Sequence, residues 1–250
     1  MKFRKIETMA LYMAILLAAC FALPETAGAM HIMEGYLPIG YCIAWGAVSL
    51  PFLVVGVMKV RRMVEENRRV LILLAMSGAF IFVISSLKIP SVTGSCSHMT
   101  GTGLAAILFG ASVTSVLGMI VLIFQAILLA HGGLTTLGAN LFSMAIAGPI
   151  ITILLYKAGK MLKINKMANV LIAASLGCLF TYCVTAIQLA VAYPSEVGGI
   201  AASAVLFLGV FAPTQVPLAI VEGLLTVIVV MGMENFAARE LRDISFVEVH

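Results

Sequence analysis

Residues 167–193 read MANVLIAASLGCLFTYCVTAIQLAVAY, an apolar stretch that contains no charged side chain. A helix rises about 1.5 Å per residue, so about 20 residues cross the ~30 Å hydrocarbon core of a membrane. Similar stretches recur at residues 38–59, 69–88, 101–131, 134–157 and 199–236. The sequence therefore predicts an all-α integral membrane protein.

The composition agrees with this fold class. Of 250 residues, 62% are hydrophobic and 10% are charged, whereas soluble domains carry about 25% charged residues. This balance excludes a soluble protein. The net charge of +4 collects in a few loops, which indicates orientation in a membrane and gives no sign of a nucleic-acid site.

Basic residues orient the predicted helices, because loops rich in lysine and arginine stay in the cytoplasm. We expect three such loops to be cytoplasmic, with the mature N-terminus outside and the C-terminus inside. They contain Lys59, Arg61, Arg62, Arg68 and Arg69; Lys157, Lys160, Lys163 and Lys166; and Arg239 and Arg242.

Two apolar stretches are too long for one ordinary crossing. Residues 101–131 must leave and return, and we expect a break near Gly110 to Gly118. Residues 199–236 must cross once overall, so the part before Pro213 is predicted to be interfacial, re-entrant or a kinked extension. The prediction is about seven transmembrane helices, with residues 89–100 forming an external loop.

Residues 1–29 have the pattern of a cleaved signal peptide. A basic start precedes an apolar stretch, and Ala27-Gly28-Ala29 supplies small residues at the cleavage site. The alternatives are a lipoprotein signal at residues 17–20, which would leave a lipidated Cys20 at the new N-terminus, and an uncleaved membrane anchor. Cleavage after Ala29 leaves residues 30–250 as one membrane domain that begins at Met30.

A mature chain that begins Met30-His31 can chelate a metal ion. The Met30 amine, the His31 amide nitrogen and the His31 Nδ1 close one five-membered and one six-membered ring, and the three nitrogens lie nearly in a plane. Such a set suits nickel(II) or copper(II), and cobalt(II) also accepts it. His98, in the external loop, is the best candidate for a fourth nitrogen.

Other donors leave alternatives open. Met33 and Met99 flank the predicted site and suggest, as an alternative, a copper(I) site with thioether ligands. His131 is expected outside, where it serves as a partner of the ligands, as an entry ligand or in structural hydrogen bonding. Cys96 is either a soft-metal ligand or a solvent-facing thiol.

Glu222 places a carboxylate near the middle of an apolar segment, which is costly and often functional. It is expected to contact a partner subunit or to pair with Gln215, Gln125 or Asn140. Small residues at helical spacing allow another helix to approach or serve the protein's own packing; they are Gly40, Ala44 and Ala47.

No phosphate-binding loop of the GxxxxGK[ST] type and no catalytic constellation occurs in the sequence. We therefore expect a non-enzyme, with any ATP hydrolysis carried out by partner subunits.

Four motifs resemble the CbiM family of cobalt-uptake proteins. They are MHIMEGYLP at residues 30–38, LKIPSVTGSCSH at 87–98, AHGGLTTLGAN at 130–140 and TQVPLAIVEGLLT at 214–226. The resemblance covers essentially the whole mature chain. One departure is that many relatives begin directly at the Met-His, so here the site depends on processing.

The resemblance implies a function in a bacterial or archaeal cell (inner) membrane. The chain would be the substrate-capture subunit of an energy-coupling-factor importer, taking up Co(II) for cobalamin synthesis. Its partners would be a small accessory membrane protein, a coupling transmembrane subunit and ATPase subunits. The implied metal ligands are Met30, His31 and His98. A nickel-importer subunit, a membrane metal sensor and an autonomous secondary carrier remain as alternatives.

Overall fold

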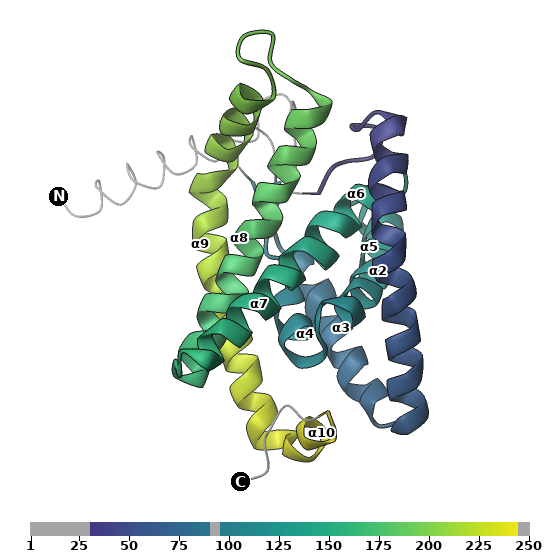
Figure 1. Ribbon diagram of the computed structural model, residues 1–250, viewed down its shortest axis with the longest axis vertical. Coiled ribbons are helices and arrows are strands. Elements are labelled where there is room, and N and C mark those ends of the chain that lie inside the picture. Colours follow the sequence, from purple (N-terminus) through teal and green to yellow (C-terminus); the bar gives the residue numbers. More distant parts are fainter. Residues whose placement is uncertain (1–30, 91–95, 245–250) are drawn as a thin grey trace, which may run out of the picture.

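The computed structural model describes residues 31–90 and 96–244, which form a bundle of helices around a short hairpin (Figure 1). The predicted signal peptide and Met30 lie outside the described residues. The helices are α2 (Ile39–Glu66), α3 (Val70–Ser86), α4 (Thr102–Phe109), α5 (Ala111–Leu129), α6 (Leu137–Asn140), the π-helix η1 (Leu141–Ala147), α7 (Gly148–Met161), α8 (Lys166–Ala192), α9 (Gly199–Phe236) and α10 (Ala238–Asp243).

Five helical stretches of the described chain are long and apolar enough to cross a membrane. These are α2, α5, the continuous stretch Leu137–Met161 made by α6, η1 and α7, and the helices α8 and α9. Helix α3 is also apolar but has 17 residues. The predicted membrane fold is therefore confirmed at the level of an all-helical multi-pass protein.

The stretch 101–131 is broken where the glycines indicated. Helix α4 ends and α5 begins at Gly110, whose φ of 84° is a conformation that favours glycine. The stretch 199–236, in contrast, is one continuous helix that contains Pro213 and Pro217. At about 1.5 Å per residue its 38 residues span roughly 57 Å, so α9 extends beyond a single membrane thickness.

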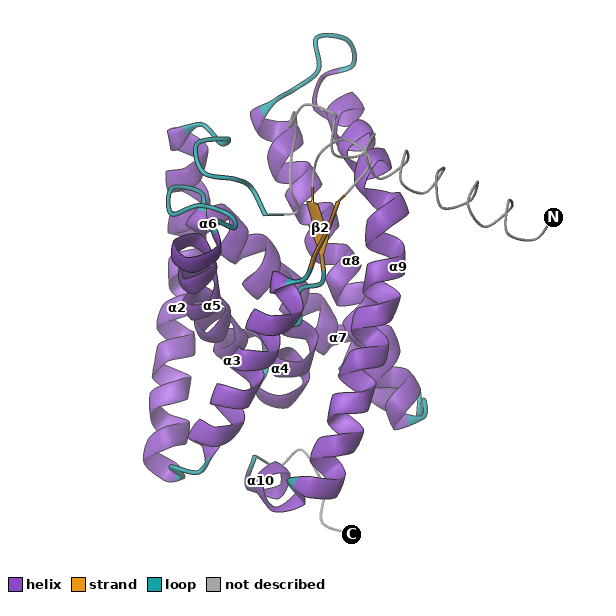
Figure 2. Cartoon of the chain, turned by 180° about the vertical axis from the view of Figure 1, so that it is seen from behind, coloured by secondary structure: helices purple, strands orange, loops and turns teal. Residues whose placement is uncertain are grey.

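The loop at 89–100 contains structure that the sequence did not reveal. Strand β1 (Lys88–Pro90) pairs antiparallel with β2 (Cys96–His98), and Lys88 lies opposite His98. Figure 2 shows this hairpin lying among the helices rather than above them. The short helix α10 was also not predicted.

Helices α7 and α8 pack with almost no space between their backbones. A Cβ added to Gly148 would lie 2.1 Å from Thr181 Oγ1, and one added to Gly177 would lie 1.8 Å from Thr152 Oγ1. Each glycine therefore leaves the space that a threonine side chain of the facing helix occupies. Small residues of this kind let helices approach closely inside a membrane.

The predicted cytoplasmic loops share one end of the molecule. The turn between α2 and α3, the turn between α7 and α8, and α10 lie together at this end in both views (Figures 1 and 2). The start of α2 and the loop between α8 and α9 lie at the opposite end. The basic clusters, which are far apart in the sequence, therefore gather at one end of the bundle.

Candidate metal centre

Three histidines from three distant segments meet at one point. His31 precedes α2, His98 ends β2, and His131 follows α5. His31 Nδ1 lies 2.5 Å from His98 Nε2 and 2.7 Å from His131 Nε2. One ligand atom from each side chain can be chosen so that all lie within 4.8 Å of one another.

All three imidazoles are buried, with exposed fractions of 2% for His31, 1% for His98 and 3% for His131. Burial lowers the pKa of His98 to about 4 and that of His131 to about 2, because the charged form loses its hydration. Burial, followed by repulsion from His98, also lowers the pKa of His31. At neutral pH the three rings are therefore uncharged, the form that binds a metal ion.

The hydrogen bonds indicate which ring nitrogen directs its lone pair toward the centre of the cluster. His98 Nδ1 donates to the carbonyl oxygen of Met99 at 2.8 Å, so its Nε2 carries a lone pair when the ring is neutral. That lone pair faces His31 Nδ1, which also faces His131 Nε2. One N–H on His31 cannot serve both neighbours well, whereas one cation between the three nitrogens can.

His31 is held by a clamp on the next residue, Ile32. The amide of Ile32 donates to Asn140 Oδ1 at 2.8 Å, and its carbonyl accepts from Asn140 Nδ2 at 3.0 Å and from Thr136 Oγ1 at 2.7 Å. Asn140 ends α6 where the π-helix begins. The asparagine side chain thus pairs with Ile32 as a neighbouring strand would, and fixes the segment that carries His31.

His131 is positioned by the end of α5. Ala130 adopts a left-handed conformation with φ of 46°, and the His131 amide donates to the Gln125 carbonyl at 3.1 Å. The chain then continues through Gly132 and Gly133. A Cβ on Gly133 would lie 2.6 Å from the Cα of Glu34, so a glycine here allows the two segments to touch.

The predicted candidates have different outcomes. The structure brings His31 and His98 together, and the atom of His31 that faces the cluster is Nδ1, the atom required for the predicted chelate. Met30 lies outside the described residues. His131 lies almost as close to His31 as His98 does, although a lesser role was predicted for it. Its only signal in the sequence is its position at an external segment end before Gly132.

The alternative soft donors receive no support from the geometry. Met33 is half exposed, and Met99 packs with Ile84 and Leu218. The side chain of Cys96 lies outside what the structure describes. Among the His, Cys, Asp and Glu side chains of the described chain, the group that converges as a possible metal site consists of these three imidazoles.

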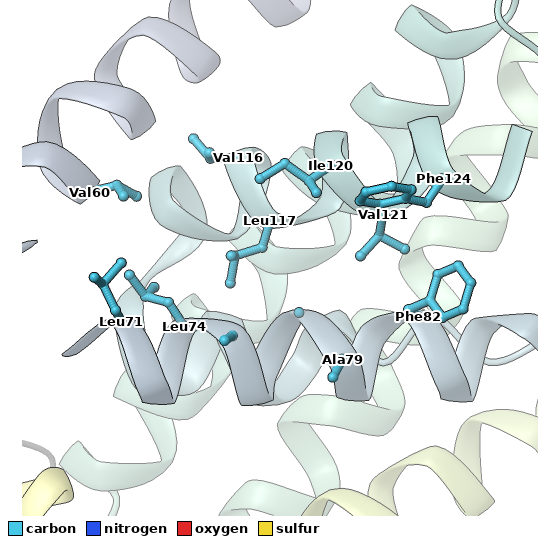
Figure 3. Close-up of a pocket in the computed structure, with 12 residues that line it drawn as sticks. Val60, Leu71, Leu74, Ala79, Phe82, Val116, Leu117, Ile120, Val121 and Phe124 are labelled. Carbon is cyan, nitrogen blue, oxygen red and sulfur yellow. The ribbon is translucent and has the colours of Figure 1, made fainter. Parts of the chain in front are cut away.

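A separate cavity of about 470 Å³ lies between α2, α3 and α5 (Figure 3). Leu74 and Phe82 of α3 line it opposite Leu117 and Phe124 of α5, and all of its lining residues are apolar. It offers no metal donor, so the histidine cluster remains the candidate site.

Comparison with known proteins identifies the family of the chain. Residues 31–240 match the CbiM family model, described as a cobalt uptake substrate-specific transmembrane region. The cobalt transport protein CbiM of Lachnoclostridium phytofermentans is 64% identical over 230 residues, which cover 92% of each chain. The protein of the same name from Clostridioides difficile is 60% identical, and the match covers 82% of each chain.

A solved structure has the same fold. The crystal structure of a truncated transition metal transporter matches with a TM-score of 0.72 at 28% sequence identity, covering 82% of this chain and 98% of that one.

Proposed function

This chain belongs to the CbiM family of cobalt uptake substrate-specific transmembrane proteins, and we propose that it captures Co(II) at the histidine cluster as the first step of import. The observation that carries the proposal is the convergence of the nitrogens of His31, His98 and His131. Ligand nitrogens about 2.0 Å from one ion and at right angles to each other are about 2.8 Å apart. The separations of 2.5 and 2.7 Å around His31 Nδ1 are close to that value.

Cleavage after Ala29 would add further donors. The amine of Met30 and the amide nitrogen of His31 would complete a chelate with His31 Nδ1, and His98 Nε2 would supply the fourth nitrogen. His131 Nε2 would then approach as an additional ligand or as a hydrogen-bond partner. Nitrogen donors of this number favour late first-row ions over calcium and magnesium, which prefer oxygen.

The same chemistry accepts nickel(II), and the Irving–Williams order places nickel above cobalt. Cobalt is the proposed substrate because the relatives in the comparisons are cobalt transport proteins. The affinities for the two ions therefore have to be compared directly.

Import is proposed to need partner subunits of the energy-coupling-factor type, because the sequence has no phosphate-binding loop of its own. These partners would be a coupling membrane subunit, ATPase subunits and a small accessory membrane protein. The product would feed cobalamin synthesis. Exposed small residues on α2 offer one place where a membrane partner can approach closely; they are Gly40, Ala44 and Ala47.

The proposed topology has seven passes, with the N-terminus outside and the C-terminus inside the cell. The five long stretches supply five passes. Helix α3 supplies a sixth, and the short helix α4 supplies the seventh. The basic end of the bundle would face the cytoplasm, so the histidine cluster would open toward the outside.

The decisive experiment is the metal content and affinity of the purified protein, with its N-terminus identified by mass spectrometry. Co(II) and Ni(II) are titrated separately into the wild type, into His98→Ala and into a variant with one residue added before Met30. We expect wild type to bind Co(II). Both variants should lose affinity by at least the roughly tenfold that loss of a residue supporting a metal ligand costs, because each of them loses a ligand itself.

Each outcome has its own meaning. If the extension has no effect while His98→Ala abolishes binding, the three imidazoles hold the ion without the terminal amine. Unchanged affinity in His98→Ala would overturn the site itself. Uptake of Co(II) by the chain alone in vesicles, without ATP or partners, would favour a secondary carrier.

A further inference from the structure

Helix α9 buries a carboxylate that the metal centre does not use directly. Glu222 has an exposed fraction of 0%. Its Oε2 accepts from the Thr100 amide at 2.6 Å, and its Oε1 accepts from Thr100 Oγ1 at 2.6 Å and from the Gly101 amide at 3.0 Å. These partners were not among the three predicted from sequence; Gln125 and Asn140 instead bond to Ser85 and Ile32.

The segment that Glu222 holds is the one that carries His98. Ser97 Oγ bonds to Thr214 Oγ1 at 2.7 Å, and Gln215 Nε2 donates to the His98 carbonyl at 2.9 Å. Residues 97–101 therefore follow α9 from Thr214 to Glu222. Gln215 and Glu222 are seven residues apart, which places them on the same face of the helix.

We propose that Glu222 is a positioning residue for the metal ligand His98: its carboxylate fixes residues 100 and 101, and so sets where His98 Nε2 lies relative to His31. This inference rests on the proposed function, since it takes His98 as a ligand. Residues that hydrogen-bond to the segment bearing a metal ligand orient that ligand and tune metal affinity.

A carboxylate can accept from each of the three donors of residues 100 and 101 that bond to Glu222. Two backbone N–H groups and one hydroxyl point at its two oxygens. A glutamine has one oxygen, so its NH₂ group must face at least one of these donors in either orientation. An alanine leaves buried N–H groups without an acceptor, which costs about 1–3 kcal/mol for each group.

The test compares Glu222→Gln with Glu234→Gln in the full-length purified protein. Glu234 is a carboxylate on the same helix, but it contacts Lys166 rather than the His98 segment. Co(II) affinity and the visible d–d spectrum are measured for both variants. We expect Glu222→Gln to lower the affinity about tenfold and to shift the spectrum toward that of His98→Ala, while Glu234→Gln keeps both at the wild-type values.

A third variant separates positioning from general stability. Val230 is buried in α9 at 1% exposure and packs in a different cluster, so Val230→Ala should lower the melting temperature without changing the spectrum. Thr100→Val removes one of the bonds to Glu222. We expect it to weaken Co(II) binding in the same direction by a smaller factor, and its effect should not add to that of Glu222→Gln.

The failures are distinguishable. If His98→Ala retains affinity, the ligand assignment fails and the positioning role with it. If His98→Ala loses Co(II) while Glu222→Gln and Thr100→Val bind with wild-type affinity and spectrum, only the positioning role is overturned. A Val230→Ala variant that changes the spectrum as Glu222→Gln does would also overturn it.

Discussion

Burial determines the acid–base behaviour of the three imidazoles. Water-exposed histidines exchange protons near pH 6.5, but removal from water lowers the pKa of His98 to about 4 and moves those of His31 and His131 in the same direction. The imidazoles of the metal-free site therefore stay neutral between pH 6 and 8 and take up no second proton. Protons and Co(II) compete for these rings only in more acidic solution.

This behaviour makes the pH dependence of Co(II) binding diagnostic. We predict that affinity falls by at least tenfold for each unit that the pH drops from 8 to 6. The imidazoles are already neutral in this range, so the released protons must come from the His31 amide and from the Met30 amine, whose ordinary pKa is about 7.7–8.0. Competition titrations at pH 6, 7 and 8 measure this slope, with circular dichroism as a control for folding. A flat profile would contradict the terminal chelate and favour an imidazole site.

The Asn140 clamp makes a second prediction at this scale. Asn140→Asp keeps an acceptor for the Ile32 amide but turns a carboxylate oxygen toward the Ile32 carbonyl, which needs a donor. We expect Co(II) affinity to fall about tenfold or more, because the segment that carries His31 is released.

The matched control is Asn165→Asp. Asn165 caps α8 by accepting from the Met167 and Ala168 amides, a task that aspartate performs equally well. Its affinity should stay at the wild-type value. Equal affinity in the two variants would show that the clamp does not hold the metal site.

At the scale of elements, the approach of α7 to α8 depends on two glycine–threonine contacts. We predict that Gly177→Ala destabilises the protein by about 1–3 kcal/mol, since the new methyl group would overlap Thr152 Oγ1. Gly232→Ala in α9 is the control, because nothing lies within 4 Å of the added Cβ and alanine is the better helix former. Thermal unfolding in the same detergent should separate the two; equal melting temperatures would contradict the tight contact.

Much of the element structure could be read from the sequence, because in a membrane length and polarity limit the choices. The apolar stretch 167–193 became α8 (Lys166–Ala192), and Gly110 separated α4 from α5. Helix α2, predicted to end at residue 59, continues to Glu66. Its last turns are polar but helical, with Arg61 and Arg62 paired to the glutamates four residues on.

Other features were beyond reach because they depend on contacts between distant segments. The hairpin strands contain only three residues each, too few for a periodic pattern. The closeness of His131 to His31 spans 100 positions of the chain, and only the packed bundle brings them together. The partners of Glu222 were missed for a related reason. Two of the groups that donate to its carboxylate are backbone amides, and amides occur all along the chain, so no sequence pattern marks these two.

At the scale of the whole molecule, the charge pattern and the bundle combine into a topology that labelling can test. The loop between α8 and α9 and the turn between α7 and α8 lie at opposite ends of the bundle (Figure 1). Val197 in the loop is 86% exposed, and Leu162 in the turn is 74% exposed. We predict that a membrane-impermeant maleimide labels Val197→Cys on intact cells but labels Leu162→Cys only after permeabilisation. The parent carries Cys96→Ser and Cys183→Ser, because Cys183 is only partly buried, whereas Cys42 and Cys178 are buried. Labelling of Leu162→Cys on intact cells, with Val197→Cys protected, would invert the topology and place the histidine cluster toward the cytoplasm, where it would serve release rather than capture.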